Sequence, residues 1–336
     1  MRAAIFEGNG RVAIAERADP KVSRPDDVLI RIAANGLCGS DLRALATPPE
    51  MVYEQGVIVG HEFSGTIEDV GDEVTLEPGA RVVVHPNIWC QTCWYCRSGH
   101  TNLCDRFVHI GSMRDGGAAE LCVVPERMVY RVSDEMAFDL AALAEPLACV
   151  LNGTKQASIH PGESVLILGG GPIGLLYLIL LKAAGASPLV VSEPAPHRAR
   201  WARELGADEV VDPRAANVQD VVRELTEGRG VDVAIDSVGA LLPDAVASVR
   251  KAGRVLVFGL NERIEAAIRP VDLVYREISI SGVYIARGTF PLAVKLLTEN
   301  KLGFDRLVTH RLELERFDEA IELLRTGEAV KALVVP

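Results

Sequence analysis

The hydrophobic and polar positions of the chain change their pattern twice along its length. Through about the first 145 residues, apolar or alternating runs of strand length are separated by glycine, proline and aspartate. This pattern has little helical periodicity and predicts a β-rich region. The runs are RAAIFE, VLIRIAA, GTIEDV, RVVVHP and AELCVVP, which begin at residues 2, 28, 65, 81 and 119.

The second pattern begins near residue 140, where DLAALAEPLACVLNGTKQA has apolar residues at helical spacing and predicts a helix over 139–157. From residue 163 onward, strand-length apolar runs alternate with amphipathic helical segments. Such alternation predicts a parallel sheet covered by helices on both faces. The predicted strands are SVLILG, PLVVSE, EVVD, VDVAIDSVG, GRVLVFG and ISISGV, and the helices between them include HRARWARELGA and NVQDVVRELTEG.

The last fifty residues or so return to mixed structure, with two predicted helices, PLAVKLLTEN and FDEAIELLRTG, and a closing strand, KALVVP. The simplest architecture is an α/β protein in which a nucleotide-binding domain is inserted into the β-rich domain. We expect the first domain to comprise residues 1–146 and 285–336, and the inserted domain to comprise residues 147–284.

Composition supports two well-packed domains, because 49% of the 336 residues are hydrophobic. The net charge of −11 opposes binding to nucleic acid or to an anionic membrane. The apolar stretch 165–181 imitates a membrane span, but its early glycines and proline favour a strand, a turn and a buried helix. The N-terminus lacks an apolar signal core, so we expect a cytoplasmic protein.

A glycine-rich turn follows the strand SVLIL. Gly169, Gly171 and Gly174 have the G-x-G-x-x-G spacing, and Pro172 and Ile173 lie between the last two of them. The first glycine allows a tight turn, the second lets backbone approach a pyrophosphate, and the third permits close packing of helix on strand. The helix N-terminus adds free N–H groups for an anion, so the turn predicts a dinucleotide site.

Glu193 ends the next predicted strand, about twenty residues further on, where a carboxylate accepts hydrogen bonds from the adenosine ribose. A carboxylate there repels a 2′-phosphate and favours NAD over NADP. Glu193 could instead be a solvated loop acid. Arg198 lies five residues later and could offset the repulsion, which leaves NADP open.

Seven cysteines are an odd number for a disulfide framework, and four of them occur within fifteen residues. Cys90, Cys93, Cys96 and Cys104 follow a C-x2-C-x2-C-x7-C spacing. Four thiolates close a tetrahedral shell around zinc and leave no open position, which predicts a structural site. An iron–sulfur cluster is the main rival, and two disulfides are a poorer fit.

A second set of metal-ligand types is spread along the β-rich region. Cys38 follows a predicted strand, His61 and Glu62 are adjacent, and Glu145 opens an otherwise apolar helix. Each is ambiguous alone, since a single cysteine is more often a buried small hydrophobe. An unpaired buried carboxylate is costly, so Glu145 needs a partner such as a metal. Together they suggest a zinc site with room for water or substrate.

Five segments in one order resemble the zinc-containing medium-chain dehydrogenase/reductase family. They are CGSD, GHEFSG, the four-cysteine loop, AEPLACV and GGGPIG, and the resemblance covers essentially the whole chain. Because of the Glu-Pro at 145–146, the chain most resembles the polyol and sorbitol dehydrogenase-like branch of this family. Threonine 3-dehydrogenases and aminocyclitol dehydrogenases are near neighbours of that branch. The resemblance implies a GroES-like catalytic domain and a Rossmann domain with a doubly wound parallel sheet.

The resemblance also implies roles for single residues. Cys38, His61 and Glu62 would hold the catalytic zinc, with Glu145 as a ligand or exchangeable near-ligand. The proton would leave the substrate through the hydroxyl of Ser40. In the family it usually continues through the cofactor ribose to a histidine, but that position is Arg43 here, so its last step is open.

The expected function is therefore zinc-dependent hydride transfer between a secondary alcohol and NAD, or NADP, in a cleft between the domains. A polyol, cyclitol or amino alcohol is the expected substrate, and the family suggests a homodimer or homotetramer. One alternative is a pseudoenzyme or regulatory protein that keeps the cofactor fold. A zinc-free quinone or enoyl reductase is a poorer alternative, because it has no need of Cys38, His61 and Glu62.

Overall fold

The computed structural model describes residues 1–336, and the chain forms two compact units. One unit comprises Met1–Ala148 and Ala286–Pro336, and the other comprises Cys149–Ile285. The boundaries expected from the sequence lie within two residues of these divisions. The chain passes from the first unit to the second within helix α4 (Ala144–Ala157).

The first unit is rich in short strands, as its alternating sequence pattern predicts. Its strands are β1 (Arg2–Gly8), β2 (Arg11–Glu16), β3 (Asp27–Gly36), β4 (Glu62–Val70), β5 (Arg81–Val84), β6 (Asn87–Ile88), β7 (Val108–His109), β8 (Leu121–Pro125), β9 (Val129–Arg131), β16 (Val308–Glu313) and β17 (Lys331–Val335). Its helices, besides the start of α4, are α1 (Gly39–Ala44), α2 (Trp94–Arg97), α3 (Phe138–Ala141), α10 (Phe290–Glu299) and α11 (Phe317–Thr326).

The main sheet of the first unit has the strand order β16-β17-β3-β4-β5-β9, and β8 also pairs with β3. The long strand β3 lies in the middle of this sheet. Nearly all of its side chains are buried, as expected for a strand covered on both faces. The C-terminal strand β17 pairs with the end of β3, and β4 pairs with β3 on its other side. The start of β4 and the start of β17 are therefore brought to the same part of the sheet.

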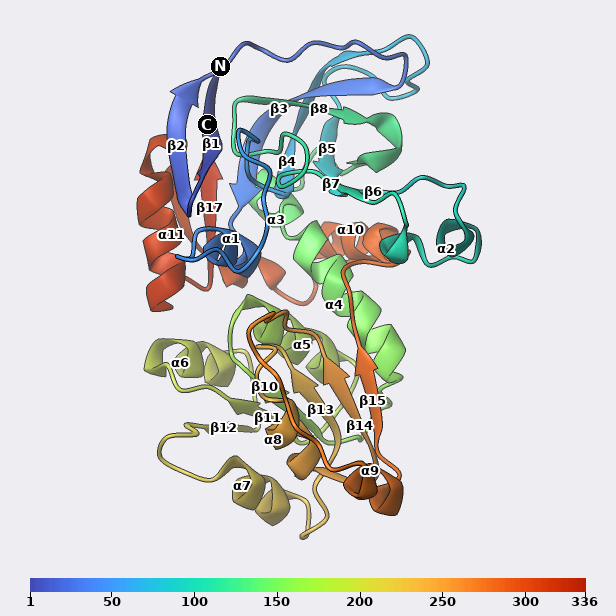
Figure 1. Cartoon of the computed structure of the whole chain (residues 1–336), viewed down its shortest axis with the longest axis vertical. Coiled ribbons are helices and arrows are strands. Elements are labelled where there is room, and N and C mark those ends of the chain that lie inside the picture. Colours follow the sequence, from blue (N-terminus) through green and yellow to red (C-terminus); the bar gives the residue numbers. More distant parts are fainter. The chain divides into compact units, whose positions relative to one another are not determined.

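The second unit holds a six-stranded parallel sheet with the order β12-β11-β10-β13-β14-β15, visible in yellow-green to orange in Figure 1. Helices α5 and α6 contact its β10–β12 half, and α8 and α9 contact β13 and β14. Its strands are β10 (Val165–Leu168), β11 (Leu189–Ser192), β12 (Glu209–Val211), β13 (Val231–Asp236), β14 (Val249–Val257) and β15 (Ser279–Gly282), and its helices are α5 (Pro172–Ala183), α6 (Pro196–Glu204), α7 (Val218–Leu225), α8 (Leu242–Ser248) and α9 (Pro270–Arg276).

The strand order of the second unit is that of the doubly wound dinucleotide-binding fold. In such sheets successive strands are added in one direction from the first strand and, from the fourth strand on, in the other, so the strand order reverses between β10 and β13, and ligands bind at the carboxyl ends of the strands there. The glycine-rich turn follows β10 directly, so it lies at this switch point.

The apolar stretch 165–181 forms strand β10 and most of helix α5, as predicted. None of the helices has the length and the apolar character that are needed to cross a membrane.

The predicted single helix over 139–157 is two helices, α3 and α4, separated at Ala142 and Leu143. Pro146 explains the break, because its ring conflicts with the carbonyl four residues earlier and it is tolerated only in the first turn of a helix. The strands β2 and β16 were not predicted. Their side chains are mostly exposed or half-buried.

Candidate functional site

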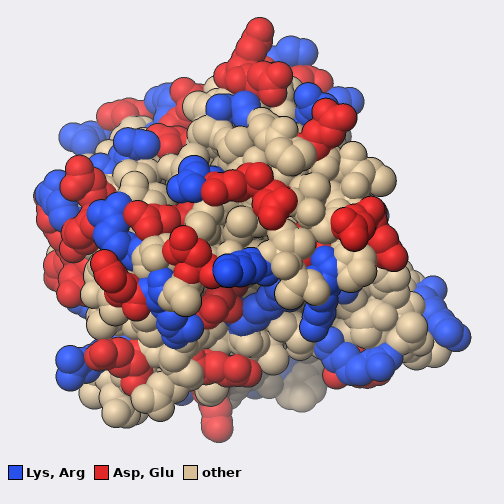
Figure 2. Space-filling model, turned by 90° about the horizontal axis from the view of Figure 1, so that it is seen from above, with Lys and Arg blue, Asp and Glu red and all other residues tan.

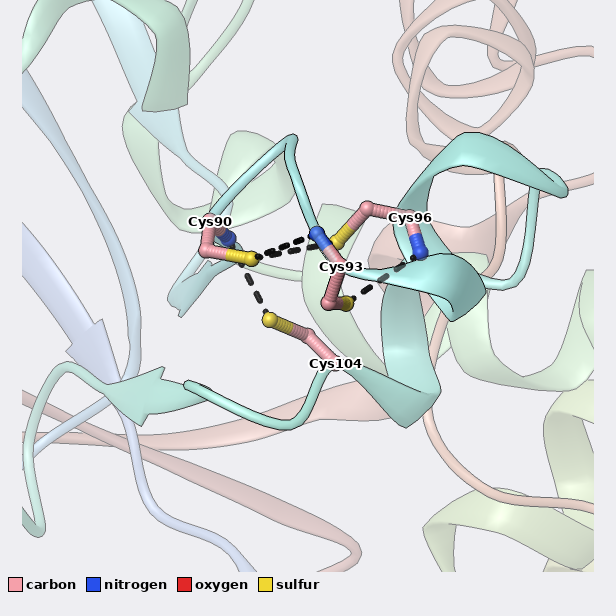
Figure 3. Close-up of side chains that lie close together, drawn as sticks. All are labelled: Cys90, Cys93, Cys96 and Cys104. Atoms are coloured by element: carbon pink, nitrogen blue, oxygen red, sulfur yellow. Dashed lines mark hydrogen bonds between the residues drawn. The ribbon is translucent and has the colours of Figure 1, made fainter.

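The four cysteines of the short loop converge on one point (Figure 3). Their sulfur atoms all lie within 4.8 Å of one another, and the Sγ atoms of Cys90 and Cys96 are 3.9 Å apart. Cys93 caps the single-turn helix α2, which turns the chain so that Cys96 comes back toward Cys90. All of the cysteines of the chain are free thiols, so the group contains no disulfide.

Backbone N–H groups of the same loop point at these sulfurs. The N–H of Cys93 donates to Cys90 Sγ at 3.3 Å, and the N–H of Cys90 donates to Cys104 Sγ at 3.2 Å. The N–H groups of Cys93 and Thr92 stabilise the thiolate and lower the pKa of Cys90 to about 5. Burial and the neighbouring cysteines raise the pKa of Cys96 to about 12, so the loop favours the thiolate at Cys90 rather than at every sulfur. Four sulfurs that converge in this way are suited to a cation held by four thiolates.

A second group of ligands lies at the end of β3 and the beginning of β4. Cys38 is the N-cap of α1, and His61 and Glu62 stand where β4 begins. One ligand atom from each lies within 4.8 Å of the others, and His61 and Glu62 are buried. The set is one sulfur, one nitrogen and one oxygen, which is a three-ligand arrangement typical of an open zinc site.

The electrostatics of this second group favour a cation. Burial by itself lowers the pKa of His61, but its hydrogen bond with Cys38 and the charges of Cys38, Asp41 and Glu145 raise the pKa to about 10. The pocket therefore stabilises positive charge strongly. The Nδ1 atom of His61 and the Oε1 atom of Glu62 are buried and have no hydrogen-bond partner, so both are open to a metal ion.

Glu145 does not belong to this three-residue group, although it was expected as a possible ligand. It is buried in the first turn of α4, and its charge raises the pKa values of His61 and Lys331. The structure thus brings Cys38, His61 and Glu62 together and leaves Glu145 as a neighbouring negative charge.

Lys331 was not predicted from the sequence as a site residue, yet it contacts Glu62 directly. Its Nζ lies 2.6 Å from Glu62 Oε2 and 3.0 Å from the carbonyl oxygen of Leu37, and both side chains are almost fully buried. Burial lowers the pKa of Lys331, but the charges of Glu62 and Cys38 outweigh this effect and raise it. The sequence offered one sign of a special role for Lys331, which is that a charged residue begins the otherwise apolar run KALVVP.

Asp41 caps the loop at the start of α1 and lies beside the histidine. Its Oδ2 accepts a hydrogen bond from the N–H of Cys38 at 2.8 Å, and its Oδ1 lies 4.0 Å from His61 Nδ1. The hydroxyl group of Tyr53 donates a hydrogen bond to the same Oδ1 at 2.9 Å. Ser40, the expected proton acceptor, has its Oγ 3.4 Å from His61 Nε2.

His109 is closer to the candidate metal group than its sequence context indicates. Its ring centroid lies 4.9 Å from that of His61, and its Nδ1 is 2.7 Å from the hydroxyl of Ser112. Burial and the neighbouring histidines lower its pKa well below the usual value, so the ring is neutral. It is therefore a polar, uncharged side chain beside the metal group, and no sequence motif marked it.

The glycine turn of the second unit has the conformation that its spacing predicts. Gly169 has φ of 103°, which is favourable only for glycine. A Cβ on Gly174 would overlap the carbonyl oxygen of Gly169, whereas a Cβ on Gly171 would meet no atom within 4 Å. The open space beside Gly171, at the N-terminus of α5, suits the backbone approach of a pyrophosphate. Pro172 and Ile173 form the first turn of that helix.

Glu193 is a buried residue rather than a solvated loop acid. Its Oε2 accepts a hydrogen bond from the N–H of Gly170, and its Oε1 accepts one from the N–H of Ala195, each at 2.7 Å. The carboxylate is thus fixed directly beside the glycine turn. Arg198 is half-buried in the first turns of α6, a few residues further on.

Comparison with known proteins identifies both parts of the chain. Residues 24–134 match the family model described as the alcohol dehydrogenase GroES-like domain, and residues 172–299 match that of the zinc-binding dehydrogenases. Sorbitol dehydrogenase of Bacillus subtilis (strain 168) is 30% identical over 100% of this chain and 97% of its own length. L-idonate 5-dehydrogenase of Vitis vinifera is 34% identical over 92% of this chain and 88% of its own.

A solved structure from Sinorhizobium meliloti 1021, described as a putative zinc-binding dehydrogenase bound to NADP, has the same fold. Its TM-score is 0.93 at 32% sequence identity, and the match covers 100% of this chain and 99% of that one. The chain therefore belongs to the zinc-containing medium-chain dehydrogenase/reductase family. The predictions of a GroES-like and a Rossmann-type fold, of zinc dependence and of an alcohol oxidoreductase are confirmed by this membership.

Proposed function

We propose that the protein oxidises a secondary alcohol with a neighbouring hydroxyl group, and reduces the corresponding ketone, with NAD as the hydride carrier. Cys38, His61 and Glu62 would hold the catalytic zinc, and the four-cysteine loop would hold a structural one. The observation that carries the proposal is the three-ligand group itself, in which sulfur, nitrogen and oxygen atoms converge within 4.8 Å beside two unpartnered buried polar atoms.

Zinc at this group would supply Lewis-acid polarisation of the substrate oxygen, and the nicotinamide would supply the hydride acceptor. Because only Cys38, His61 and Glu62 would hold the metal, room would remain beside it for the substrate oxygen. Ser40, half-buried beside His61, is placed to accept the hydroxyl proton as the carbonyl forms. Asp41 fixes the start of α1 through the N–H of Cys38, so it positions both the thiolate and the serine.

Arg43 is half-buried in α1 and cannot take the histidine's part as a base, because a guanidinium group keeps its proton in proteins. In this chain the proton would instead pass to solvent through water, directly or with the help of Glu62 or Glu145. Placement of the active site between the two domains stays a prediction.

NAD is the favoured cofactor because Glu193 is buried and held beside the glycine turn by two backbone N–H groups. Each carboxylate oxygen has a further lone pair for a ribose hydroxyl, whereas a 2′-phosphate would meet a fixed negative charge. The NADP-bound relative shows why both cofactors should be tested. Arg198 is the residue through which NADP would be tolerated.

The named relatives act on sorbitol and L-idonate, which both carry adjacent hydroxyl groups. We therefore place the substrate among polyols and polyhydroxy acids, with cyclitols and amino alcohols as further candidates. The free cysteines fit the predicted reducing cytoplasm. The predicted homodimer or homotetramer is supported by the edge strand β15, which pairs on one side only, and by the exposed Val274 and Tyr275 of α9.

The test combines metal analysis with a substrate panel. We expect two zinc ions per chain and NAD-linked oxidation of sorbitol, xylitol, L-idonate or 2,3-butanediol, with slower turnover of 2-butanol, which lacks the neighbouring hydroxyl. Cys38→Ser should remove one zinc and abolish turnover while NADH still binds. Cys122→Ala removes a buried cysteine outside both metal groups and should keep both zinc ions.

Turnover that survives in Cys38→Ser, or a wild-type protein with two zinc ions and no NAD- or NADP-linked oxidation of any secondary alcohol, would refute the proposal.

A further inference from the structure

The buried Lys331 has no place in the proposed chemistry, although it is bound to a proposed metal ligand. Its side chain is 3% exposed, and that of Glu62 is 1% exposed. An ammonium group is costly to bury unless it is paired and hydrogen-bonded. Here it is paired with Glu62 Oε2 at 2.6 Å and also donates to the carbonyl oxygen of Leu37 at 3.0 Å.

Three neighbouring strands bring this pair together. Lys331 opens β17, Gly36 ends β3, and Glu62 opens β4, and the sheet order is β17-β3-β4. Gly36 lies directly opposite Glu62 in the β3–β4 pairing. A Cβ on Gly36 would overlap Glu62 Oε2, so the glycine leaves the gap through which the lysine reaches the carboxylate.

The two oxygens of Glu62 are in different situations. Oε2 is occupied by the ammonium, whereas Oε1 is buried and has no hydrogen-bond partner. A carboxylate can bind a metal through one oxygen or through both. With Oε2 held by Lys331, only Oε1 remains for the metal that Cys38 and His61 face.

Charge leads to the same conclusion. The thiolate of Cys38 and the carboxylate of Glu62 already balance a divalent cation, and Asp41 and Glu145 add negative charge next to them. Each additional negative charge makes a bound metal a weaker Lewis acid. Lys331 is the cation that the structure buries among these groups, and its charge interacts with Glu62, Cys38 and Glu145.

We infer that Lys331 is a positioning residue that restricts Glu62 to one-oxygen, weak coordination of the catalytic metal, and so keeps a coordination position open for substrate. This inference rests on the proposed function, because it requires a metal held by Cys38, His61 and Glu62. It assigns to the last strand of the chain a part in setting the reactivity of a site built mainly from β3, α1 and β4.

The test is the rate at which zinc leaves the catalytic site of Lys331→Met. Without the ammonium, Glu62 offers both oxygens and its full charge to the metal. We expect zinc release to a chelator to become about tenfold slower, while kcat falls by about 10- to 100-fold, the usual size of effects from groups that contact metal ligands. The zinc of the four-cysteine loop, which should leave at the wild-type rate, is the internal reference.

Cobalt substitution gives a second readout that does not depend on turnover. Cobalt in the wild-type site should show the intense visible absorption of a four-coordinate ion, and Lys331→Met should show the weaker absorption of a five-coordinate one. Lys182→Met is the matched control. That lysine also donates to a backbone carbonyl, that of Gly206, but it is exposed and belongs to the other unit.

A purely structural role for Lys331 predicts the opposite sign, because a loosened site releases zinc faster. Release at the wild-type rate or faster in Lys331→Met therefore overturns the inference. If that variant does not fold, Lys331→Ala, which also leaves Glu62 Oε2 without its donor, gives the same comparison. The proposed function fails separately, if the wild-type protein holds only the four-cysteine zinc.

Discussion

Gly171 and Gly174 belong to the same motif in the turn after β10, but their surroundings differ: one has open space where a side chain would be, and the other does not. An added methyl group at Gly171 would meet no atom within 4 Å, whereas at Gly174 it would overlap the carbonyl oxygen of Gly169. Gly171 therefore reserves space for a ligand, and Gly174 reserves space for the protein's own backbone.

Alanine at these two positions should separate cofactor binding from stability. We expect Gly171→Ala to keep the wild-type Tm and to bind NADH about tenfold more weakly, because its methyl group faces the approach of the pyrophosphate. Gly174→Ala should lose about 1–3 kcal/mol of stability, the usual cost of overpacking. Thermal melts and fluorescence titration with NADH measure both effects, and a lower Tm for Gly171→Ala than for Gly174→Ala would contradict this assignment.

His85 is a buried base whose neutral form the fold requires. Its ring stacks on that of Phe290 at 4.7 Å, and its Nδ1 accepts a hydrogen bond from the N–H of Asn87 at 3.3 Å. Burial lowers the pKa of His85 from 6.5 to about 4. Between these values the unfolded chain binds a proton that the folded protein does not, so the free energy of unfolding falls as the pH falls from 6.5 to 4.

The size of this pH effect can be tested with His85→Asn, whose amide can still accept from the N–H of Asn87. We expect the wild-type protein to lose about 3 kcal/mol more stability than this variant between pH 6.5 and 4. Denaturant unfolding at several pH values measures the difference. His160→Asn, at an exposed histidine, should follow the wild-type curve. Parallel curves for His85→Asn and wild type would show that the buried ring is not responsible.

At the scale of single elements, the loop around α2 depends on its own short-range contacts. Its sulfurs accept hydrogen bonds from neighbouring N–H groups, and the loop has few buried side chains apart from Cys104 and Asn102. Such a loop requires a metal to hold its shape, since little apolar burial is available to stabilise it.

Cys96→Ser should therefore remove one zinc per chain and lower the Tm by about 5 °C, because the closed ligand shell is lost. The kcat of the folded fraction should change little, since the other metal group shares no ligand with this loop. Metal analysis, thermal melts and steady-state kinetics give the three values. Ser98→Ala, in the same loop but hydrogen-bonded to Tyr95 O rather than to a sulfur, is the control. A selective loss of kcat in Cys96→Ser would assign this loop a catalytic part.

At the scale of the whole molecule, the candidate metal groups and the candidate cofactor site belong to different compact units. The candidate metal groups lie in Met1–Ala148 with Ala286–Pro336, and the glycine turn with Glu193 lies in Cys149–Ile285. Figure 2 shows one face of the molecule, on which acidic and basic side chains are intermixed rather than gathered into a basic patch. That face agrees with a small-molecule substrate and gives no footprint for a nucleic acid.

Metal removal should therefore abolish turnover without abolishing cofactor binding. We expect the chelator-treated protein to bind NADH with an affinity within about threefold of the wild type, since the cofactor groups are held by a separate core. Added zinc should restore activity. Gly171→Ala is the converse case, with both metals and weakened NADH binding. Loss of NADH binding together with the metal would show that the two units do not bind their ligands independently.

The strand–helix alternation, the glycine turn and the four-cysteine loop could be predicted because their residues are neighbours in sequence. Spacing alone then fixes which side chains converge. The break between α3 and α4 was missed because helical periodicity outweighed the effect of Pro146. The strands β2 and β16 were missed; each pairs with a neighbour, β1 or β17, and has few fully buried side chains of its own.

The sequence by itself determined the two kinds of domain, the dinucleotide turn and the types of metal ligand, since each is a local pattern of residues. Only the tertiary structure decided that Glu62, rather than Glu145, joins Cys38 and His61, and that Lys331 binds Glu62 across Gly36. Lys331 and Glu62 are 269 positions apart. Their contact depends on the order of strands in a sheet, which is set by packing of the whole unit and has no local signature in the chain.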